Sequence, residues 1–434
     1  MSASIRSSVA LAGLALGLGA GASAAHAAPR KQPPRITAAV VNQVKHQDRY
    51  KRFSHLSPAT KGLVREGRHD GPGRLRGIPS FSDAFTVDGV SYPYTMAGRA
   101  PRRGGETRID TSLIAISFKF DEFADAQGNS LVIGTQDIVG DVVGSPNFVR
   151  SEYSVGRAQF GDAVQKASFF NVAERDWHTT LERPRQLTPV TIEVPVGMAQ
   201  VFDIGGGRQV AIVNGDFLFS QIQTILQLEP IRTDELPILV SHNVFADFAL
   251  GFHDAFEVTD GNRHGIQTYT WTSWLDVDAF GPIFADATTL THEISEWISD
   301  PFINNETPGW ILPGSSACLN ILEVGDPIEL LDTQMFPVTI NGKLYHTQNE
   351  ATLSWFARDV PAMARALGWG EGGKSVAPFY VDLESPVPDS GIPKPGPLRA
   401  RLKDDHLQYA ITWFGLAAVM LDRKSTRLNS SHAN

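Results

Sequence analysis

The chain is poor in cysteine, because Cys318 is the only thiol among its 434 residues. A single cysteine excludes an intrachain disulfide, and a chain of this length can bury a large enough core without one. The Gly-x-Ser-x-Gly turn of serine hydrolases is also missing. The glycine run at 205–207 has no phosphate-binding lysine. These absences exclude disulfide-stabilised, serine-nucleophile and phosphate-loop proteins.

Basic residues are in the minority, so a nucleic-acid partner is not expected. The chain has 38 Lys and Arg against 47 Asp and Glu, a formal net charge of −9. The exception is the stretch 29–105, which carries 15 Lys and Arg but only 5 Asp and Glu. No basic motif there is interleaved with aromatic residues. Because residues 28–105 are also rich in Pro, Arg and Gly, they predict a basic arm or propeptide.

The first 27 residues have the pattern of a bacterial signal peptide. Arg6 supplies the positive start, residues 9–18 the short apolar core, and Ala25-His26-Ala27 the small-residue cleavage site. We therefore expect cleavage after Ala27 and a secreted or periplasmic protein.

From residue 106 the pattern predicts a folded α+β body, with an N-terminal part at 106–230 and a metal-site half at 231–373. Alternating apolar residues and β-branched or aromatic content predict strands, and apolar residues at helical spacing predict two helices. The expected strands are Asp110–Phe120, Val190–Val196, Leu236–Phe245, Gly251–Val258 and Gln267–Leu275. The expected helices are Phe160–Phe170 and Asp216–Leu228.

A third helix carries the most informative motif, His292-Glu-Ile-Ser-Glu296. We expect it to begin at Asp286 as N-cap and to stop at Asp300, which precedes a proline. Positions i and i+4 share a helix face, so His292 and Glu296 can hold one cation between them. Glu293 is rotated by about 100° and can polarise a metal-bound water.

The motif resembles the zinc-binding helix of metallopeptidases, His-Glu-x-x-His, with Glu296 in place of the second histidine. The segment 320–327, Asn-Ile-Leu-Glu-Val-Gly-Asp-Pro, resembles the later part of glutamate zincins. That resemblance implies that Glu323 is the third metal ligand. It also implies that Asp326 accepts a hydrogen bond from His292 and fixes its tautomer.

Together these motifs resemble a group of uncharacterised secreted bacterial zincin-like proteins over about residues 80–372. The strands LVSHNVF (239–245), GFHDAF (251–256) and QTYTWTSW (267–274) fit the same group. The resemblance implies a zincin-like mixed sheet with an active-site helix and a loop-rich C-terminal half. It also implies that Gln267–Leu275 is an edge strand that pairs with an extended substrate.

The chemistry of this donor set leaves several roles open. One histidine and two carboxylates make a neutral centre with Zn²⁺, and they also suit Mn²⁺ or Ca²⁺. His346 or Tyr345, after a strand, is a candidate to stabilise an oxyanion. Asp300 is expected to bond a loop amide. His253 is interpreted as a packed strand histidine, with an additional ligand as the alternative.

The resulting prediction is a secreted, monomeric metal-dependent endopeptidase that acts on peptides or proteins with Glu293 as general base. The first alternative is a non-catalytic secreted peptide-binding protein on a degenerate zincin scaffold. A metal-free polar cluster of His292, Glu296 and Glu323 is also open.

The end of the chain differs from the rest. APFYVD (377–382) and DHLQYAITWFGLAAV (405–419) resemble the C-terminal part of the surfeit-locus cytochrome oxidase assembly family. The apolar run at 409–421 is shorter than the roughly 20 residues of a membrane span, and residues 422–434 resemble translated adapter sequence. We therefore predict that residues 374–434 are foreign to the preceding protein. The alternative is a genuine anchor on an envelope-anchored assembly protein.

Overall fold

The computed structural model divides the chain into two compact units, 1–357 and 358–434, and all residues that it describes lie in the first. The described residues are 30–37, 56–57, 60–61, 64, 76–87, 89–153, 155–260, 263–277, 281, 284–311, 318–328 and 335–348. The predicted signal peptide, part of the predicted arm and the predicted foreign tail at 374–434 lie outside them. The signal peptide and the foreign tail stay predictions.

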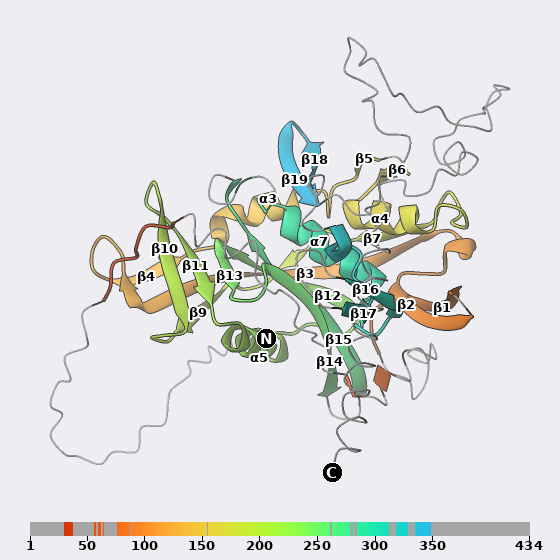
Figure 1. Cartoon of the computed structure of the whole chain (residues 1–434), viewed down its shortest axis with the longest axis horizontal. Coiled ribbons are helices and arrows are strands. Elements are labelled where there is room, and N and C mark those ends of the chain that lie inside the picture. The colour runs from red at the N-terminus through yellow and green to blue at the C-terminus, as the bar shows by residue number, and fades with distance from the viewer. Residues whose placement is uncertain are drawn as a thin grey trace, which may run out of the picture. The chain divides into compact units, whose positions relative to one another are not determined.

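A large mixed sheet forms the centre of the body (Figure 1). Its main path runs β14 (Gly251–Asp260), β15 (Arg263–Trp274), β12 (Glu235–His242), β3 (Glu106–Ala124) and β4 (Ser130–Ile133). Strand β12 is parallel to both β15 and β3, whereas β14–β15 and β3–β4 are antiparallel pairs. The long β3 also pairs in parallel with β7, β8 and β9. Mixed sheet and helices agree with the expected α+β class, and the zincin-like topology stays a prediction.

The remaining elements are short and surround this sheet. They are β1 (Ser80–Val87), β2 (Val90–Ala97), η1 (Pro101–Arg103), η2 (Gln136–Ile138), α3 (Val139–Val143), β5 (Ser151–Tyr153), β6 (Gly156–Ala158), α4 (Phe160–Ser168), β7 (His178–Leu181), β8 (Arg185–Gln186), β9 (Val190–Val194), β10 (Ala199–Gly205), β11 (Arg208–Val213), α5 (Gly215–Leu228), β13 (Val244–Ala246), α7 (Thr288–Ser299), β16 (Glu306–Ile311), β17 (Cys318–Ile321), η3 (Asp326–Ile328), β18 (Met335–Ile340) and β19 (Lys343–Gln348). No helix within these described stretches is long and apolar enough to cross a membrane.

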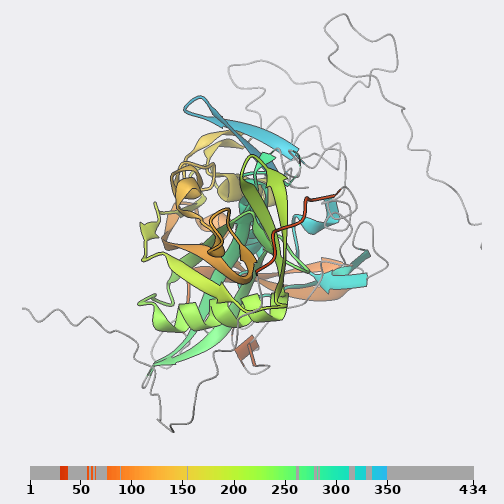
Figure 2. The ribbon, with the colours of Figure 1, turned by 90° about the vertical axis from the view of Figure 1, so that its left-hand side faces the viewer.

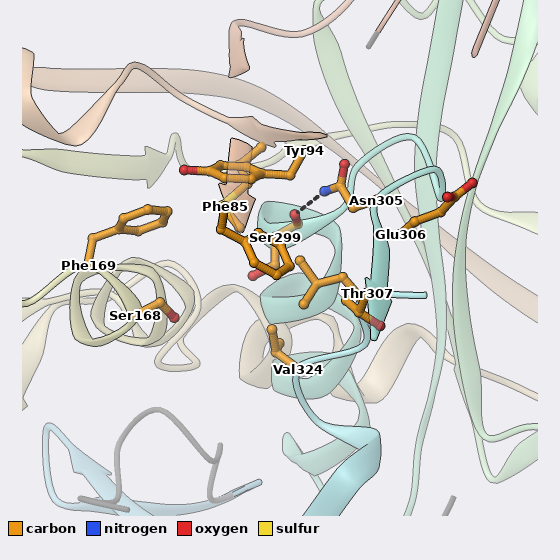
Figure 3. A pocket seen from close by; sticks show the side chains of 11 residues that line it. Phe85, Tyr94, Ser168, Phe169, Ser299, Asn305, Glu306, Thr307 and Val324 are labelled. Carbon is orange, nitrogen blue, oxygen red and sulfur yellow. Dashed lines mark hydrogen bonds between the residues drawn. The ribbon is translucent and has the colours of Figure 1, made fainter. Parts of the chain in front are cut away.

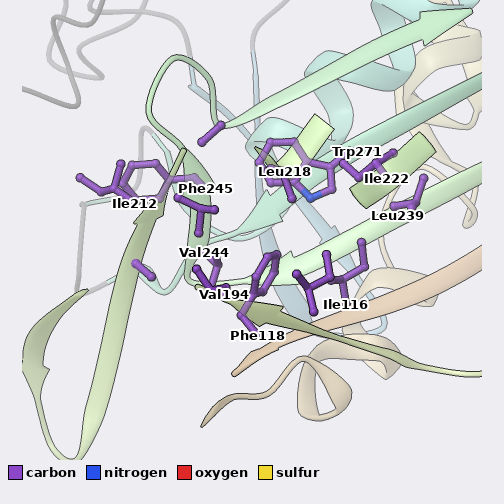
Figure 4. Packing of buried hydrophobic residues seen from close by; sticks show 14 of the residues in the cluster. Ile116, Phe118, Val194, Ile212, Leu218, Ile222, Leu239, Val244, Phe245 and Trp271 are labelled. Carbon is purple, nitrogen blue, oxygen red and sulfur yellow. The ribbon is translucent and has the colours of Figure 1, made fainter. Parts of the chain in front are cut away.

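Strand β12 shows why a nearly continuous apolar run becomes a central strand. Its side chains alternate between two cores: Leu239 belongs to one, and Ile238 and Val240 belong to the other. Helix α5 covers the first face with Leu218 and Ile222, as Figure 4 shows. Helix α7 covers the second face, and Figures 1 and 2 place the two helices on opposite sides of the sheet. Burial on both faces explains the absence of polar alternation.

Helix α7 buries the apolar stripe that the sequence predicts. Leu290, Ile294, Trp297 and Ile298 are at most 1% exposed, and each such aliphatic side chain contributes about 1.5–3 kcal/mol by leaving water. The neighbouring α4 approaches closely at Gly161, where a Cβ would lie 2.7 Å from Ile298 Cδ1. The metal-motif helix is therefore held firmly between the sheet and α4.

The predicted N-cap of this helix is wrong. The helix begins at Thr288, and Ala287 occupies the cap position without a side-chain hydrogen bond. Asp286 instead adopts a positive φ of 39°, and its carboxylate accepts hydrogen bonds from the backbone and ring of His346 on β19. The local sequence pattern assigned the Asp286 carboxylate to the N-terminus of the helix, but this carboxylate binds a strand that is distant in sequence.

The predicted edge strand is also wrong. Strand β15 lies between β14 and β12, so both of its edges are paired. Because β14 pairs antiparallel with β15, β14 and not β15 lies at the end of the main path of the sheet.

Part of the predicted arm belongs to the folded body. Strands β1 and β2 form an antiparallel hairpin over residues 80–97, and Ala97 is fully buried in the same core as Ile294 of α7. The predicted boundary at residue 105 therefore falls after a structured hairpin.

Candidate metal centre

Three segments that are far apart in sequence bring acidic and imidazole side chains together. Helix α7 contributes His292, Glu293 and Glu296, strand β14 contributes His253, and the segment after β17 contributes Glu323 and Asp326. Two groups have potential ligand atoms within 4.8 Å of one another. One is His253, Glu296 and Glu323, and the other is His292, Glu296 and Asp326.

Glu296 is the carboxylate that both groups share. Its Oε1 accepts a hydrogen bond of 3.1 Å from the Gly325 backbone N–H. Its Oε2 lies 3.0 Å from His292 Nε2 and 4.0 Å from His253 Nδ1. One oxygen is thus fixed by the loop that follows Glu323, while the other faces both imidazoles.

The predicted set of three ligands is rearranged. Glu323 is grouped with His253 instead of His292, and His292 is grouped with Asp326. Asp326 does contact His292 as predicted, at 3.4 Å, but the contact is to Nε2. Glu296 faces the same nitrogen. Asp326 is therefore placed as a third donor beside Glu296, not as a partner on the opposite side of the ring.

His253 is the site residue that the sequence interpretation gave too little weight. It is 5% exposed, its Nδ1 lies 3.5 Å from Glu293 Oε2, and its Nε2 is buried without a hydrogen-bond partner among the described residues. A signal was present in the period-two pattern of β14. Phe252 and Phe256 join the core on the α5 face, which leaves Gly251, His253 and Ala255 on the α7 face.

The glycine at the start of β14 makes room for Glu293. A Cβ at Gly251 would lie 2.7 Å from Thr289 Cγ2 and 2.8 Å from both Cγ and Oε1 of Glu293. These separations are shorter than real carbon contacts allow, so a side chain here would displace the carboxylate. Gly251 therefore belongs to the architecture of the site although it donates no ligand.

Burial and mutual repulsion shape the protonation of the carboxylates. Burial, followed by repulsion from Glu296 and Asp326, raises the pKa of Glu323 well above its usual value. Burial also raises the pKa of Glu293 to about 6. Burial alone would raise the pKa of Glu296, but His292 outweighs it, and the pKa is lowered.

For the two imidazoles, burial acts to lower the pKa and the neighbouring carboxylates raise it. Burial would lower the pKa of His292, but Glu296 and Asp326 outweigh it, and the pKa is raised well above its usual value. The pKa of His253 is raised for the same reason, with Glu293 and Glu296 as the main carboxylates. In the absence of a metal, protons on the imidazoles thus offset an excess of buried negative charge.

The donor set fits a divalent cation. Glu323 Oε2 is a buried carboxylate oxygen without a hydrogen-bond partner in the described part of the chain, and such an atom is costly unless it meets a cation or a donor. Imidazole with carboxylates, and no thiolate, suits Zn²⁺ or Mn²⁺.

The remaining predicted residues lie elsewhere or act structurally. His346 Nδ1 is 2.9 Å from Asp286 Oδ2, and Tyr345 is a core residue whose ring meets Trp274 edge to face. Their hydrogen bonds and ring contacts do not run to the metal cluster. Asp300 ends α7 and accepts hydrogen bonds of 3.0 Å from the backbone N–H groups of Asn304 and Asn305, as expected of a helix-stop residue.

A small apolar cavity lies beside the C-terminal end of α7, where Ser299 lines it (Figure 3). Its volume is about 270 Å³. Aromatic side chains of β1, β2 and the end of α4 line one side, and Leu322 and Val324 line another. Those two residues flank Glu323 in the chain, so one short segment borders both the cavity and the metal cluster.

Comparison with protein families matches the C-terminal part of the chain. Residues 308–418 match the SURF1 family. The chain is 34% identical to Surfeit locus protein 1 of Rattus norvegicus over 82 residues, which is 19% of this chain and 24% of the relative. It is 41% identical to the Homo sapiens protein over 66 residues, covering 15% and 19%. It is 36% identical to the Arabidopsis thaliana protein over 96 residues, covering 21% and 26%.

The chain thus spans about a quarter of the length of these relatives. No solved structure matches. The predicted resemblance to the surfeit-locus family is confirmed for the C-terminal part, and the match begins at residue 308, well before the expected boundary at 374. The zincin-like resemblance has no support from these comparisons.

These findings overturn the predicted function. The similarity points to an oxidase assembly family, which is not a secreted zinc metallopeptidase. The alternative of a secreted peptide-binding protein on a degenerate zincin scaffold is not supported either. The paired edges of β15 remove the docking strand on which that alternative rested.

Proposed function

We propose that the folded body of this chain is a metal-binding domain that holds a divalent cation between His253, Glu296 and Glu323. Two observations carry the proposal: a carboxylate oxygen of Glu323 lies within 4.8 Å of ligand atoms of His253 and Glu296, and Glu323 Oε2 is buried without a hydrogen-bond partner among the described residues. A cation there would satisfy that oxygen and offset the charge of carboxylates that burial otherwise forces toward protonation.

The donor chemistry sets the order of candidate ions. One imidazole and two carboxylates match the ligand types of Zn²⁺, so zinc is the first candidate. Mn²⁺ and Ca²⁺ follow, because carboxylate oxygens suit harder ions. The bound ion would supply local positive charge, while Gly325 N–H keeps Glu296 oriented through its other oxygen.

Elemental analysis of the purified full-length chain tests the proposal. We expect bound metal in the wild type and a loss of at least tenfold in affinity for Zn²⁺ in Glu323→Gln, measured by competition with a chromophoric chelator. Glu193→Gln is the matched control, since that exposed carboxylate pairs with Lys119 on the sheet and belongs to neither ligand group. A wild-type chain that takes up no Zn²⁺, Mn²⁺ or Ca²⁺ would contradict metal binding.

A second candidate function rests on the similarity over residues 308–418: a role in assembling a cytochrome oxidase. The matched stretch includes Glu323 and Asp326, so the family-like segment and the metal cluster overlap. Deleting the gene in the source organism and measuring assembled cytochrome oxidase activity tests this role. We expect reduced activity that the full chain restores, and unchanged oxidase activity would exclude it.

A further inference from the structure

We infer that the cluster binds two divalent ions, with Glu296 shared between them. The second ion would lie between His292, Glu296 and Asp326. This inference rests on the proposed metal-binding function and extends it from one ion to a paired centre.

The first support is the division of the donors. Two separate sets of ligand atoms each fall within 4.8 Å, and the only residue common to both is Glu296. Each set has one imidazole and two carboxylates. A bridging carboxylate between two such sets is how proteins commonly build two-metal centres.

The second support is the direction of the side chains. Glu296 Oε2 lies 3.0 Å and Asp326 Oδ1 lies 3.4 Å from the same atom, His292 Nε2. A carboxylate that only oriented the ring of a metal-binding histidine would meet its other nitrogen. Three donors that converge on one point describe a ligand set. Glu296 Oε2 also faces His253 Nδ1 at 4.0 Å, so the bridging oxygen is directed at both sets.

The third support is charge. Four carboxylates border the two sets, namely Glu293, Glu296, Glu323 and Asp326. When ionised they carry four negative charges, which two divalent ions balance with neutral imidazoles. A single ion leaves two of these charges to be offset by protons on the imidazoles, whereas two ions balance all four. Asp300 is a further buried carboxylate beside the cluster, and its two oxygens accept backbone N–H groups.

Manganese is the probe that separates one ion from two. Full-length chain is stripped of metal and titrated with Mn²⁺, and bound ions are counted by equilibrium dialysis and atomic emission. We expect two Mn²⁺ per chain and an electron paramagnetic resonance spectrum broadened by coupling between neighbouring ions. A count of one Mn²⁺ with an uncoupled six-line spectrum would overturn the paired centre but keep the proposed function. A count of zero would overturn the paired centre, and it would overturn the proposed function as well if the chain also takes up no Zn²⁺ or Ca²⁺.

Three substitutions then assign the ions. Asp326→Asn should lower the count from two to one and remove the coupling, while Glu323→Gln should remove the other ion. Glu296→Gln should weaken both sites by at least tenfold, because it alone belongs to both sets. Circular dichroism and Glu193→Gln control for folding and charge. If Asp326→Asn retains two coupled ions in a folded chain, the second site is wrongly assigned.

Discussion

At the scale of single residues, Gly251 is as important to the cluster as the ligands. Gly251→Ala would push a Cβ against the Glu293 side chain, which is itself 4% exposed and unable to retreat into solvent. We expect the free energy of unfolding to fall by about 1–3 kcal/mol, as overpacking of a core does, and metal affinity to fall with it. Urea denaturation and chelator competition measure the two effects.

The matched control for this substitution is Gly140→Ala. Gly140 lies in α3 with nothing within 4 Å of an added Cβ. Alanine favours a helix over glycine by roughly 0.5–1 kcal/mol, so this variant should be as stable as the wild type or more so. Equal destabilisation by the two substitutions would show that the contact with Glu293 is not the cause.

A second residue-scale prediction concerns Asp276, away from the metal cluster. The His242 ring nitrogen at 2.9 Å, helped by Asn243 and Arg208, lowers the pKa of Asp276 to about 2. A lowered folded pKa means that the carboxylate stabilises the fold above its unfolded pKa of about 4 and loses this contribution as pH falls toward 2. Asp276→Asn should therefore cost about 2 kcal/mol at pH 7 and far less near pH 2.

Urea denaturation at both pH values measures this dependence. Asp137→Asn serves as the control, because that carboxylate is exposed on η2 and its loss should leave stability nearly unchanged at both pH values. An Asp276→Asn effect that is equal at pH 7 and near pH 2 would contradict the electrostatic account.

At the scale of elements, α5 offers a clean test of capping. The Asn214 side chain accepts a hydrogen bond of 3.0 Å from Phe217 N–H at the start of the helix. Asn214→Ala leaves that donor unsatisfied and should lower the free energy of unfolding by about 1 kcal/mol. Thermal denaturation measures it against Ser220→Ala, a substitution on the exposed face of the same helix. Equal stability of the two variants would contradict a capping role.

The elements also show what could be predicted from the sequence and what could not. Helix α5 and strand β9 follow from local periodicity, because an amphipathic stripe or a short β-branched run needs no distant partner. The position of β15 does not follow, since its neighbours are set by pairing with β12 and β14. The predicted N-cap role of Asp286 is wrong for the same reason, because its partner His346 is 60 residues away.

The candidate site likewise contains some contacts that the sequence predicts and others that depend on tertiary packing. His292 and Glu296 are neighbours on one helix, so the i, i+4 rule brings them together from sequence alone. The choice between Glu323 and Asp326 as their companion depends on how the segment after β17 lies on α7, and the structure selects Asp326 for His292. The presence of His253 in the site depends on which face of β14 packs against α7. That face is decided by packing of Phe252 and Phe256 on the other side.

At the scale of the whole molecule, the segment 308–418 that is similar to the SURF1 family overlaps the folded body. This overlap bears on the origin of the C-terminal part. The similarity starts at residue 308, yet β16 and β17 pair with each other and the segment after them supplies Glu323 and Asp326 to α7. The predicted joint at 374 lies beyond all of these. Continuous sequencing reads of source DNA across codons 370–380 would contradict a foreign tail, and a break in coverage there is the expected result.

Metal removal should weaken the folded body as a unit, because the cluster ties α7, β14 and the segment after β17 together. A ligand that binds only the folded state adds about 2.7 kcal/mol of stability at a hundredfold excess over its dissociation constant. The metal-free chain leaves four carboxylates crowded around two imidazoles, so stripping the ion with a chelator should lower the melting temperature by several degrees. Calorimetry before chelation, after it and after adding Zn²⁺ back measures the change, with Glu296→Gln, which lacks the ligand common to both sets, as a chain that should respond far less. Identical melting with and without metal would mean that protons alone balance the buried charge of this cluster.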